Sequence, residues 1–589
     1  AVAYNLILPT FFAFLAMGAF SFGWNLLVSW KARSGGEGYP GGRMGVPSRP
    51  LLAGLAAAVA LLILGNLGTV RMIWHGMMRL AAPNGAFADG HILQKIVWTA
   101  QGFGRLLFGG MKLPYSPGDW YWIPSRAIPN EPITEFPFFT FLYGDPHAHL
   151  FALPLTLLGL SWALSIVLGR WQWGDRAGRL RWTHYAASFL LGGLAIGSLR
   201  PTNTWDMPTY LAFGVLAVLY ASLRNLTLFT RREDGLALFP RRIGAVLGSV
   251  LLLVGLSFVL FQPFANWYAQ GYTSLRLWDG DHTPFWSYFT HWGLFLFVIV
   301  TWLVWETRDW MALTPASHLK RLRPYVWLIQ GLALLLVLAV LLLMLVLKVS
   351  IAWVALPLAA WAGVLILRPG QPDEKRFVLF MVGTALVLTL AVEIIVLVGD
   401  IGRMNTVFKF YLQAWTLLSL SAAAALFWLW RAVQEAWSPR LRGAWGGVLA
   451  VLLASALLFP LLATADKVTD RMSDAAPRTL DGMAYMPYSV YYENDHELRL
   501  LEDYQAIRWM QENVQGSPVI VEGHVSEYRW GSRYTIYTGL PGVVGWNWHQ
   551  RQQRALVPPE WVTQRVDQIG QFYTTNDQQA ARDFLNRYG

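Results

Sequence analysis

A short stretch around residue 145 gathers side chains that can do chemistry. In FLYGDPHAHL (141–150), Asp145, His147 and His149 lie within five residues of one another, directly before a long apolar run. If the stretch is extended, all three side chains point to one side, and carboxylate and imidazole groups that converge in this way can bind a divalent metal ion. If the stretch is helical, only Asp145 and His149 can meet. The alternative is that Asp145 and Pro146 simply begin the next helix, as its N-cap and first residue.

Glu135 and a second stretch place charge where a membrane protein normally avoids it. Glu135, ten residues before Asp145, adds a second carboxylate to the first cluster. In SLRPTNTWDMPTY (198–210), Arg200, Asn203 and Asp206 are costly near a bilayer unless they are paired or face a water-filled cavity. An arginine in such a position suggests an anion as ligand, although Asn and Asp before Pro also make an ordinary turn between helices.

A third stretch, GDIGRMNTVFKFYLQ (399–413), carries two cations. Arg403 and Lys409 flank Asn405, and two cations at the end of a span can bind a phosphate. The alternative is that they extend to the membrane interface. A fourth stretch, LWDGDHTPFW (277–286), resembles a metal loop, but short Asp-Gly-Asp turns are common and we favour the turn.

The C-terminal tail reads as a small mixed α/β domain. Residues 498–514 have helical spacing, 519–523 form a buried-strand pattern, and 532–546 predict one or two further strands. Arg533 and His549 belong to an aromatic and basic surface that could stack on a sugar or contact lipid phosphates. A solvated domain surface is the alternative reading.

The composition shows which elements must position these residues. Of 589 residues, 55% are hydrophobic, 14% are charged and none is cysteine, which excludes a soluble enzyme, disulfides and thiolate metal sites. We expect a mainly α, polytopic transmembrane bundle of about twelve helices, each near the ~20 residues that a bilayer requires. The predicted spans are 4–30, 50–69, 146–169, 186–204, 207–224, 243–262, 288–305, 325–346, 350–367, 377–399, 410–430 and 444–463.

The loops between these segments predict the topology. Loops such as 31–49, 170–181, 224–242 and 368–376 each carry several Lys or Arg residues and are therefore predicted to be cytoplasmic. This asymmetry accounts for much of the net charge of +11, so we expect no nucleic-acid partner. The protein is predicted to be a multi-pass plasma (cytoplasmic) membrane protein with a transmembrane domain over 1–463. The long loop 70–145 and the α/β domain 464–589 are predicted to be extracytoplasmic.

Four segments carry a resemblance to a known family. EFPFFTFLYGDPHAH (135–149), RPTNTWDMPTY (200–210), GRMNTVFKFYLQ (402–413) and TGLPGVVGWNWHQRQQR (538–554) resemble the Chlor_Arch_YYY family of polytopic membrane proteins. The layout is also similar to that of the GT-C glycosyltransferases, which have many helices, an acidic first outer loop and an outer C-terminal domain. The resemblance implies a polyprenyl-phosphate-linked sugar as donor. In that superfamily two acids are often adjacent in the first loop, whereas Glu135 and Asp145 are ten residues apart here.

The glycosyltransferase hypothesis gives each candidate residue an expected role. The lipid-phosphate leaving group is an anion, which Arg200, Arg403, Lys409 and Asn405 are expected to bind. Asp145, with Glu135 second, is expected to orient or deprotonate the acceptor hydroxyl, while His147 and His149 would hold a divalent metal ion or position the donor phosphate. Asn203, Asp206, Arg533 and His549 are accessory residues. We expect Asp145, Arg200 and Arg403 to converge on one cavity at the outer face.

Two other functions remain open at this point. A transporter for a lipid or anion would carry charges within its spans, and Glu393 is the clearest such residue. A non-catalytic subunit would instead present a wide surface to membrane-protein partners and to membrane lipids, with its polar clusters scattered.

Overall fold

The protein is described from a computed structural model that covers residues 2–33, 49–130, 132–169, 182–225, 238–269, 274–493 and 495–588. It divides into two compact units. The larger comprises Phe11–Phe261 and Leu275–Asp470, and the smaller comprises Ala1–Thr10, Gln262–Ser274 and Arg471–Gly589. Several basic loops of the predicted topology, including 170–181 and most of 224–242, lie outside the described residues.

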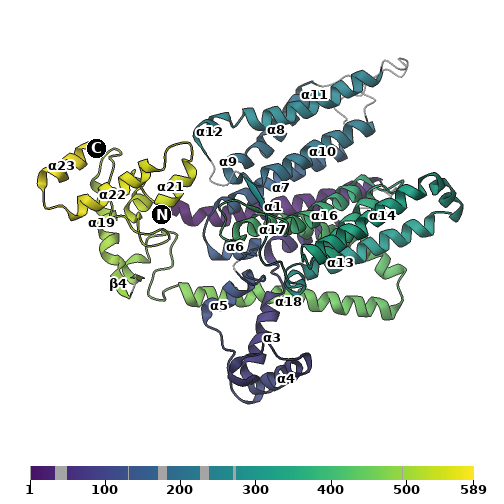
Figure 1. The fold of residues 1–589 in the computed structure, drawn as a ribbon, viewed down its shortest axis with the longest axis horizontal. Coiled ribbons are helices and arrows are strands. Elements are labelled where there is room, and N and C mark those ends of the chain that lie inside the picture. The colour runs from purple at the N-terminus through teal and green to yellow at the C-terminus, as the bar shows by residue number, and fades with distance from the viewer. Residues whose placement is uncertain are drawn as a thin grey trace, which may run out of the picture. The chain divides into compact units, whose positions relative to one another are not determined.

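The first half of the chain is almost entirely helical (Figure 1). Its elements are α1 (Val2–Arg33), α2 (Arg49–Ala58), η1 (Val59–Ile63), α3 (Gly68–Ala81), η2 (Pro83–Gly85), α4 (Ile92–Phe108), α5 (Pro117–Trp122), η3 (Ile123–Ser125), α6 (Pro137–Tyr143), α7 (Ala148–Leu168), α8 (Trp182–Gly197), α9 (Leu199–Asn203), α10 (Met207–Asn225), α11 (Leu238–Val259) and α12 (Gln262–Trp267). The predicted outer loop 70–145 therefore contains four α-helices of its own among its described residues.

The second half continues the bundle. It consists of β1 (Leu275–Leu277), α13 (Phe285–Leu313), η5 (Ala316–Tyr325), α14 (Val326–Leu341), η6 (Leu342–Val346), α15 (Ala352–Ile366), α16 (Asp373–Ala391), β2 (Ile395–Leu397), α17 (Met404–Glu435) and α18 (Pro439–Arg471). Strands β1 and β2 pair antiparallel, with Arg276 opposite Val396.

The C-terminal segment of the smaller unit, which begins at Arg471, contains helices and one two-stranded sheet. It contains η7 (Met486–Tyr488), β3 (Val490–Glu493), β4 (His496–Arg499), α19 (Leu500–Asn513), α20 (Arg533–Thr538), α21 (Asn547–Gln553), α22 (Glu560–Thr574) and α23 (Gln578–Tyr588). The predicted helix at 498–514 is confirmed as α19. The strands predicted within 519–523 and 532–546 are wrong, because only an isolated bridge between Ile520 and Gly542 forms there.

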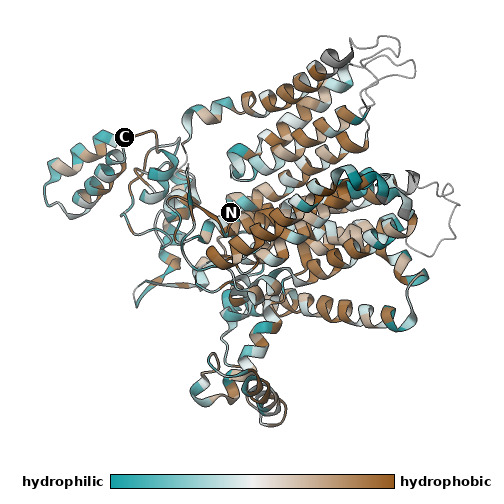
Figure 2. Ribbon diagram, turned by 45° about the vertical axis from the view of Figure 1, so that its right-hand side comes forward, coloured by the Kyte–Doolittle hydropathy of each residue, from teal (hydrophilic) through white to brown (hydrophobic). Residues whose placement is uncertain are grey.

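The long helices have the length and composition of membrane-spanning segments. Most predicted spans fall on helices, since a helix satisfies its own backbone polar groups in lipid, but the expected count of about twelve spans is not confirmed. Within the described residues, seven helices are long and apolar enough to cross a membrane, or eight if the bent pair of α2–η1 and α3 is one span. Apolar residues dominate these helices, while hydrophilic ones gather at their ends (Figure 2).

One predicted span is too long. The segment 377–399 was expected to be a single helix, but α16 stops at Ala391 and β2 follows. The β-branched Ile395 and Val396 pair with β1 in this short sheet, and Glu393 is buried between the two elements in an ion pair.

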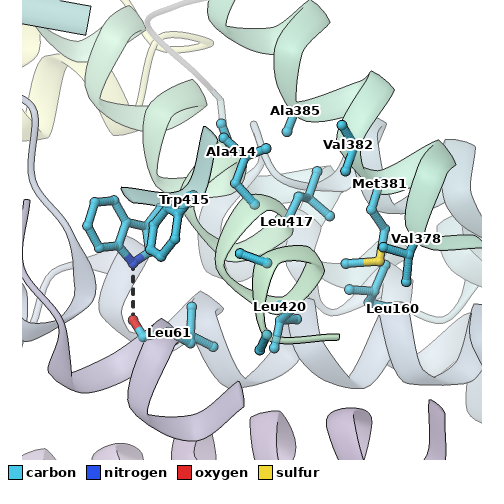
Figure 3. Close-up of a cluster of buried hydrophobic side chains, with 14 of the residues drawn as sticks. Leu61, Leu160, Val378, Met381, Val382, Ala385, Ala414, Trp415, Leu417 and Leu420 are labelled. Atoms are coloured by element: carbon cyan, nitrogen blue, oxygen red, sulfur yellow. Dashed lines mark hydrogen bonds between the residues drawn. The ribbon is translucent and has the colours of Figure 1, made fainter. Parts of the chain in front are cut away.

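The core of the larger unit lies around α17, which packs against α13 and α16. The side chains of Trp292, Trp302 and Trp415 are fully buried there. Trp415 also donates a hydrogen bond from Nε1 to the carbonyl oxygen of Leu61 at 3.1 Å, as Figure 3 shows. Burying a large side chain contributes about 1.5–3 kcal/mol, so this contact fixes the long helix against η1.

A buried charged cluster links the C-terminal part of α13, the residues after α15 and the first turn of α16. Glu306 of α13 accepts a hydrogen bond from Arg368 at 3.0 Å and from Trp302 at 3.1 Å, and it forms an ion pair with Lys375. Arg368 also contacts Asp309 at 2.7 Å. Because buried charges are tolerated only when they are paired, this cluster stabilises the packing of these helices.

Close packing of α3 against α4 gives a stability prediction. A Cβ at Gly102 would lie 1.9 Å from the carbonyl oxygen of Met77, whereas a Cβ at Gly104 has nothing within 4 Å. We expect Gly102→Ala to lower the free energy of unfolding by ~1–3 kcal/mol through overpacking. Gly104→Ala should raise it by ~0.5–1 kcal/mol, because alanine loses less backbone entropy in a helix. Thermal unfolding in detergent compares the two variants, and shifts of the same sign would contradict the packing.

Candidate functional site

The stretch 144–149 forms a turn between two helices. Gly144 ends α6 with a left-handed φ of 76°, and His147, not Asp145, is the N-cap of α7. The interpretation of Asp145 and Pro146 as N-cap and first helical residue is therefore wrong. The reason is local: the backbone N–H of His147 donates to the carbonyl of Asp145 at 2.8 Å, which delays the helix to Ala148.

Two separate pairs replace the expected convergence of three residues. His147 Nδ1 lies 2.9 Å from Asp145 Oδ2, with side chains 54% and 49% exposed. His149 Nε2 lies 3.8 Å from Glu135 Oε2, with side chains only 12% and 14% exposed. The two imidazole rings lie side by side, 5.9 Å apart. The turn thus presents one half-exposed and one buried acid–imidazole pair.

Glu135 is the most deeply buried acid of this cluster. Its carboxylate accepts a hydrogen bond from Thr140 Oγ1 at 3.3 Å. Burial raises the pKa of Glu135 to about 7, although the positive charge of Arg126 and the hydrogen bond from Thr140 oppose this rise. A carboxyl group with a pKa near 7 can accept a proton at neutral pH and also return it, which suits a general base.

Aromatic rings contact two cations, of which Arg126 interacts electrostatically with Glu135. The guanidinium of Arg126 stacks on Trp122 at 4.1 Å from the ring centre, and Lys467 of α18 lies 4.6 Å from the centre of Tyr143. Neither cation was singled out from the sequence. Their position at the ends of apolar segments was visible, but nothing in the spacing linked them to Glu135.

The stretch 198–210 and the turn at 144–149 both lie near the first turns of α17. Asn203 donates to Asp206 at 2.9 Å. Burial raises the pKa of Asp206 to about 7, opposed by hydrogen bonds from Asn203 and Gln413 and by the charge of Lys409. Lys409 also interacts electrostatically with His149, whose ring packs edge-on against Phe408 at 4.5 Å. The first turns of α17 therefore lie between the two polar stretches.

Other predicted phosphate ligands are engaged elsewhere. Arg200 stacks over Phe258 at 5.3 Å. Arg403 donates to Glu393 Oε1 at 2.7 Å and to Thr283 Oγ1 at 3.1 Å. No hydrogen bond, ion pair or ring contact found in the described residues joins Asp145, Arg200 and Arg403, so their convergence on one cavity stays a prediction.

Asn405 has a capping role in this structure. Asp400 accepts hydrogen bonds from the Asn405 side chain at 3.0 Å and from the backbone N–H groups of Asn405 and Thr406 at 3.1 and 2.8 Å. These are the free N–H groups at the start of α17, which a carboxylate stabilises. The Asn405 amide is thus part of a helix cap.

The remaining candidates have local partners. Asp279 pairs with Arg276 at 3.1 Å, and Asp281 accepts a hydrogen bond from Asn130 at 3.0 Å. In the smaller unit, Arg533 pairs with Asp503 at 2.8 Å and His549 contacts the Tyr528 hydroxyl at 3.0 Å.

The expected metal site at Asp145, His147 and His149 stays a prediction. In the part of the chain that the structure describes, no three His, Asp or Glu side chains are grouped so as to hold a metal ion. Asp145 and His147 face each other, while His149 faces Glu135.

The raised pKa values give a titration prediction. The folded pKa of Glu135, about 7, lies above its ordinary value of 4.5, so protonation favours the folded state. This group stabilises the fold fully below pH 4.5 and loses that contribution as the pH rises to about 7. We expect a protonated carboxyl band in difference infrared spectra that disappears near pH 7. Glu135→Gln and Asp206→Asn should each remove part of the band; an unchanged band in both variants would contradict the assignment.

The helices and the polar residues at their ends define a polytopic membrane protein. A family model described as Uncharacterized membrane protein (DUF2298) matches residues 1–418. The chain belongs to this family. The comparisons give no support for the Chlor_Arch_YYY family or for the GT-C likeness. Neither curated proteins nor solved structures gave a match.

Proposed function

We propose that the chain is a GT-C-type glycosyltransferase that moves a sugar from a polyprenyl-phosphate donor to an acceptor at the outer face of the membrane. One observation carries the proposal: Glu135, a buried carboxyl with a raised pKa, lies beside His149 and within electrostatic reach of Arg126. A transfer from a lipid phosphate needs this combination of a base for the acceptor and positive charge for the leaving group.

The pair of Glu135 and His149 can hold an acceptor hydroxyl. Their nearest atoms are 3.8 Å apart, and His149 Nε2 has no hydrogen-bond partner among the described residues. A hydroxyl that bridges both atoms would lie ~2.8 Å from each, which is ordinary hydrogen-bond geometry. Glu135 then takes the proton as the hydroxyl oxygen bonds to the sugar carbon, and the bond from that carbon to the phosphate oxygen breaks.

The cations serve the leaving group in this proposal. Arg126 interacts electrostatically with Glu135, and Lys409 with His149, while Lys467 lies over the ring of Tyr143. They take the role that the sequence suggested for Arg200 and Arg403. The half-exposed pair of Asp145 and His147 can orient the acceptor in this proposal.

The transporter alternative has less support than transfer. It relied on a charged residue within a span, and Glu393 is instead paired with Arg403, with both side chains almost fully buried. Moving a substrate past this pair would require a buried ion pair to open, which costs several kcal/mol.

The test is sugar transfer by the purified chain in liposomes. We expect protein-dependent release of polyprenyl phosphate from labelled polyprenyl-phosphate hexoses or pentoses. Arg126→Gln should weaken donor binding by roughly tenfold or more, the effect of losing one charged hydrogen bond. Arg276→Gln is a matched control, since Arg276 is exposed and paired with Asp279. Failure of all donors to bind or react would overturn the proposal.

A further inference from the structure

A pocket in the smaller unit is lined by three arginines. It has a volume of about 240 Å³ and lies between α21, the turn that follows it and α22. Arg551, Arg554 and Arg565 line it together with Trp561 and Gln550, and no Asp or Glu is among its lining residues. The pocket is therefore positive and is open to an anion.

The three guanidinium groups are held in place but keep donors for a ligand. Arg565 donates one hydrogen bond, to the carbonyl of Val543 at 2.9 Å. Arg554 uses Nε to contact Gln550 at 2.8 Å. Arg551 contacts Asn547 at 2.6 Å, and its Nε is buried without a hydrogen-bond partner among the described residues.

Nearby acids leave the positive charge largely uncompensated. Glu527 interacts electrostatically with Arg551, yet its carboxylate accepts from the backbone N–H of Trp548 at 2.7 Å. Among the ion pairs of the described residues, none involves the three arginines. Guanidinium groups bind phosphate and carboxylate with paired, charge-assisted hydrogen bonds.

Trp561 adds a flat apolar surface to the same pocket. Its side chain is 62% exposed, and it makes no ring contact with the other described aromatic residues. Ligand pockets combine an aromatic surface with a few fixed polar groups, and those for drug-sized ligands hold ~300–1,000 Å³. The smaller volume here suits a single sugar ring, whose C–H face can stack on the indole.

We propose that this pocket binds a saccharide that carries a phosphate or a carboxylate. The arginines bind the anionic group and Trp561 stacks on the ring. This site lies in the smaller unit and is independent of transfer at Glu135, so binding can be tested whether or not the chain turns over a donor.

Calorimetry on the full chain in detergent provides the test, with glucose 6-phosphate and glucuronate as probes. We expect at least one of them to bind and neutral glucose to bind at least tenfold more weakly. Arg554→Gln and Arg565→Gln should each weaken binding by roughly tenfold or more. Arg582→Gln makes the same charge change on exposed α23 and should have no effect.

Trp561→Ala distinguishes a saccharide from a simple anion. It should weaken the sugar probe but leave the affinity for inorganic phosphate unchanged. The proposal is overturned if neither probe binds, if glucose binds as tightly as they do, or if inorganic phosphate matches them. An Arg565→Gln effect no larger than that of Arg582→Gln would also overturn it.

Discussion

Glu135→Gln is expected to lower the rate of sugar transfer by ~10²–10⁴-fold, the usual contribution of a general base. The substitution keeps the size of the side chain and removes only its ability to accept a proton. Because burial already disfavours the charged form of Glu135 and raises its pKa to about 7, a neutral amide should not unfold the chain. The loss should appear in the turnover rate, while donor binding stays near that of the wild type.

The pH profile separates this role from a structural one. With the wild type, transfer should rise as the pH increases through about 7, because Glu135 must lose its proton to act as a base. Asp145→Asn is the matched control: its carboxylate is half exposed and pairs with His147, so a smaller loss is expected. Equal losses in the two variants, or undiminished transfer by Glu135→Gln, would remove Glu135 from catalysis.

Arg403→Ala is expected to lower the free energy of unfolding by ~3–5 kcal/mol, the cost of leaving a buried charge without its partner. The side chains of Arg403 and Glu393 are only 2% and 0% exposed. Arg403 also donates to the carbonyl of Val392 at 3.0 Å. The substitution would leave Glu393 with His282 and Thr283 alone.

A double variant tests this interpretation of Arg403. Replacing both partners, with Glu393→Leu and Arg403→Met, should cost less than Arg403→Ala, because no unpaired charge remains. Thermal unfolding and the yield of monodisperse protein in detergent measure both effects. If Arg403→Ala keeps full stability but loses donor binding, the sequence-based role of Arg403 as a phosphate ligand is correct instead.

Arg403 and Glu135 are both buried, but their surroundings differ. Arg403 has two close partners and a filled set of contacts, which makes it part of the scaffold between β1, β2 and α17. Glu135 Oε2 lies 3.8 Å from His149 Nε2. This distance is too long for a direct hydrogen bond but allows a hydroxyl to bridge the two atoms. The Glu135–His149 pair therefore keeps hydrogen-bonding capacity for a hydroxyl, whereas the Arg403–Glu393 ion pair is already closed.

The strand predicted within 532–546 is wrong because of a partner that lies outside this stretch. Residues 532–546 alternate like a strand, yet α20 forms over Arg533–Thr538. Glu522 accepts the backbone N–H groups of Tyr534 and Thr535 at 2.9 and 3.2 Å, and a carboxylate at that position stabilises a helix start. The spacing within 532–546 contains no sign of this contact.

The sequence by itself determined the class of protein and the positions of its long helices. Apolar runs of about 20 residues have one stable form in a bilayer, because only a helix pairs its own backbone groups there. It also placed Glu135, His149, Asp206 and Lys409 in the stretches worth examining. What it could not determine was the pairing: His149 with Glu135, Lys409 with Asp206 and His149, and Arg403 with Glu393. Those pairs depend on the turn at Gly144 and on the packing of α17, and only the tertiary structure decides which charge is buried against which.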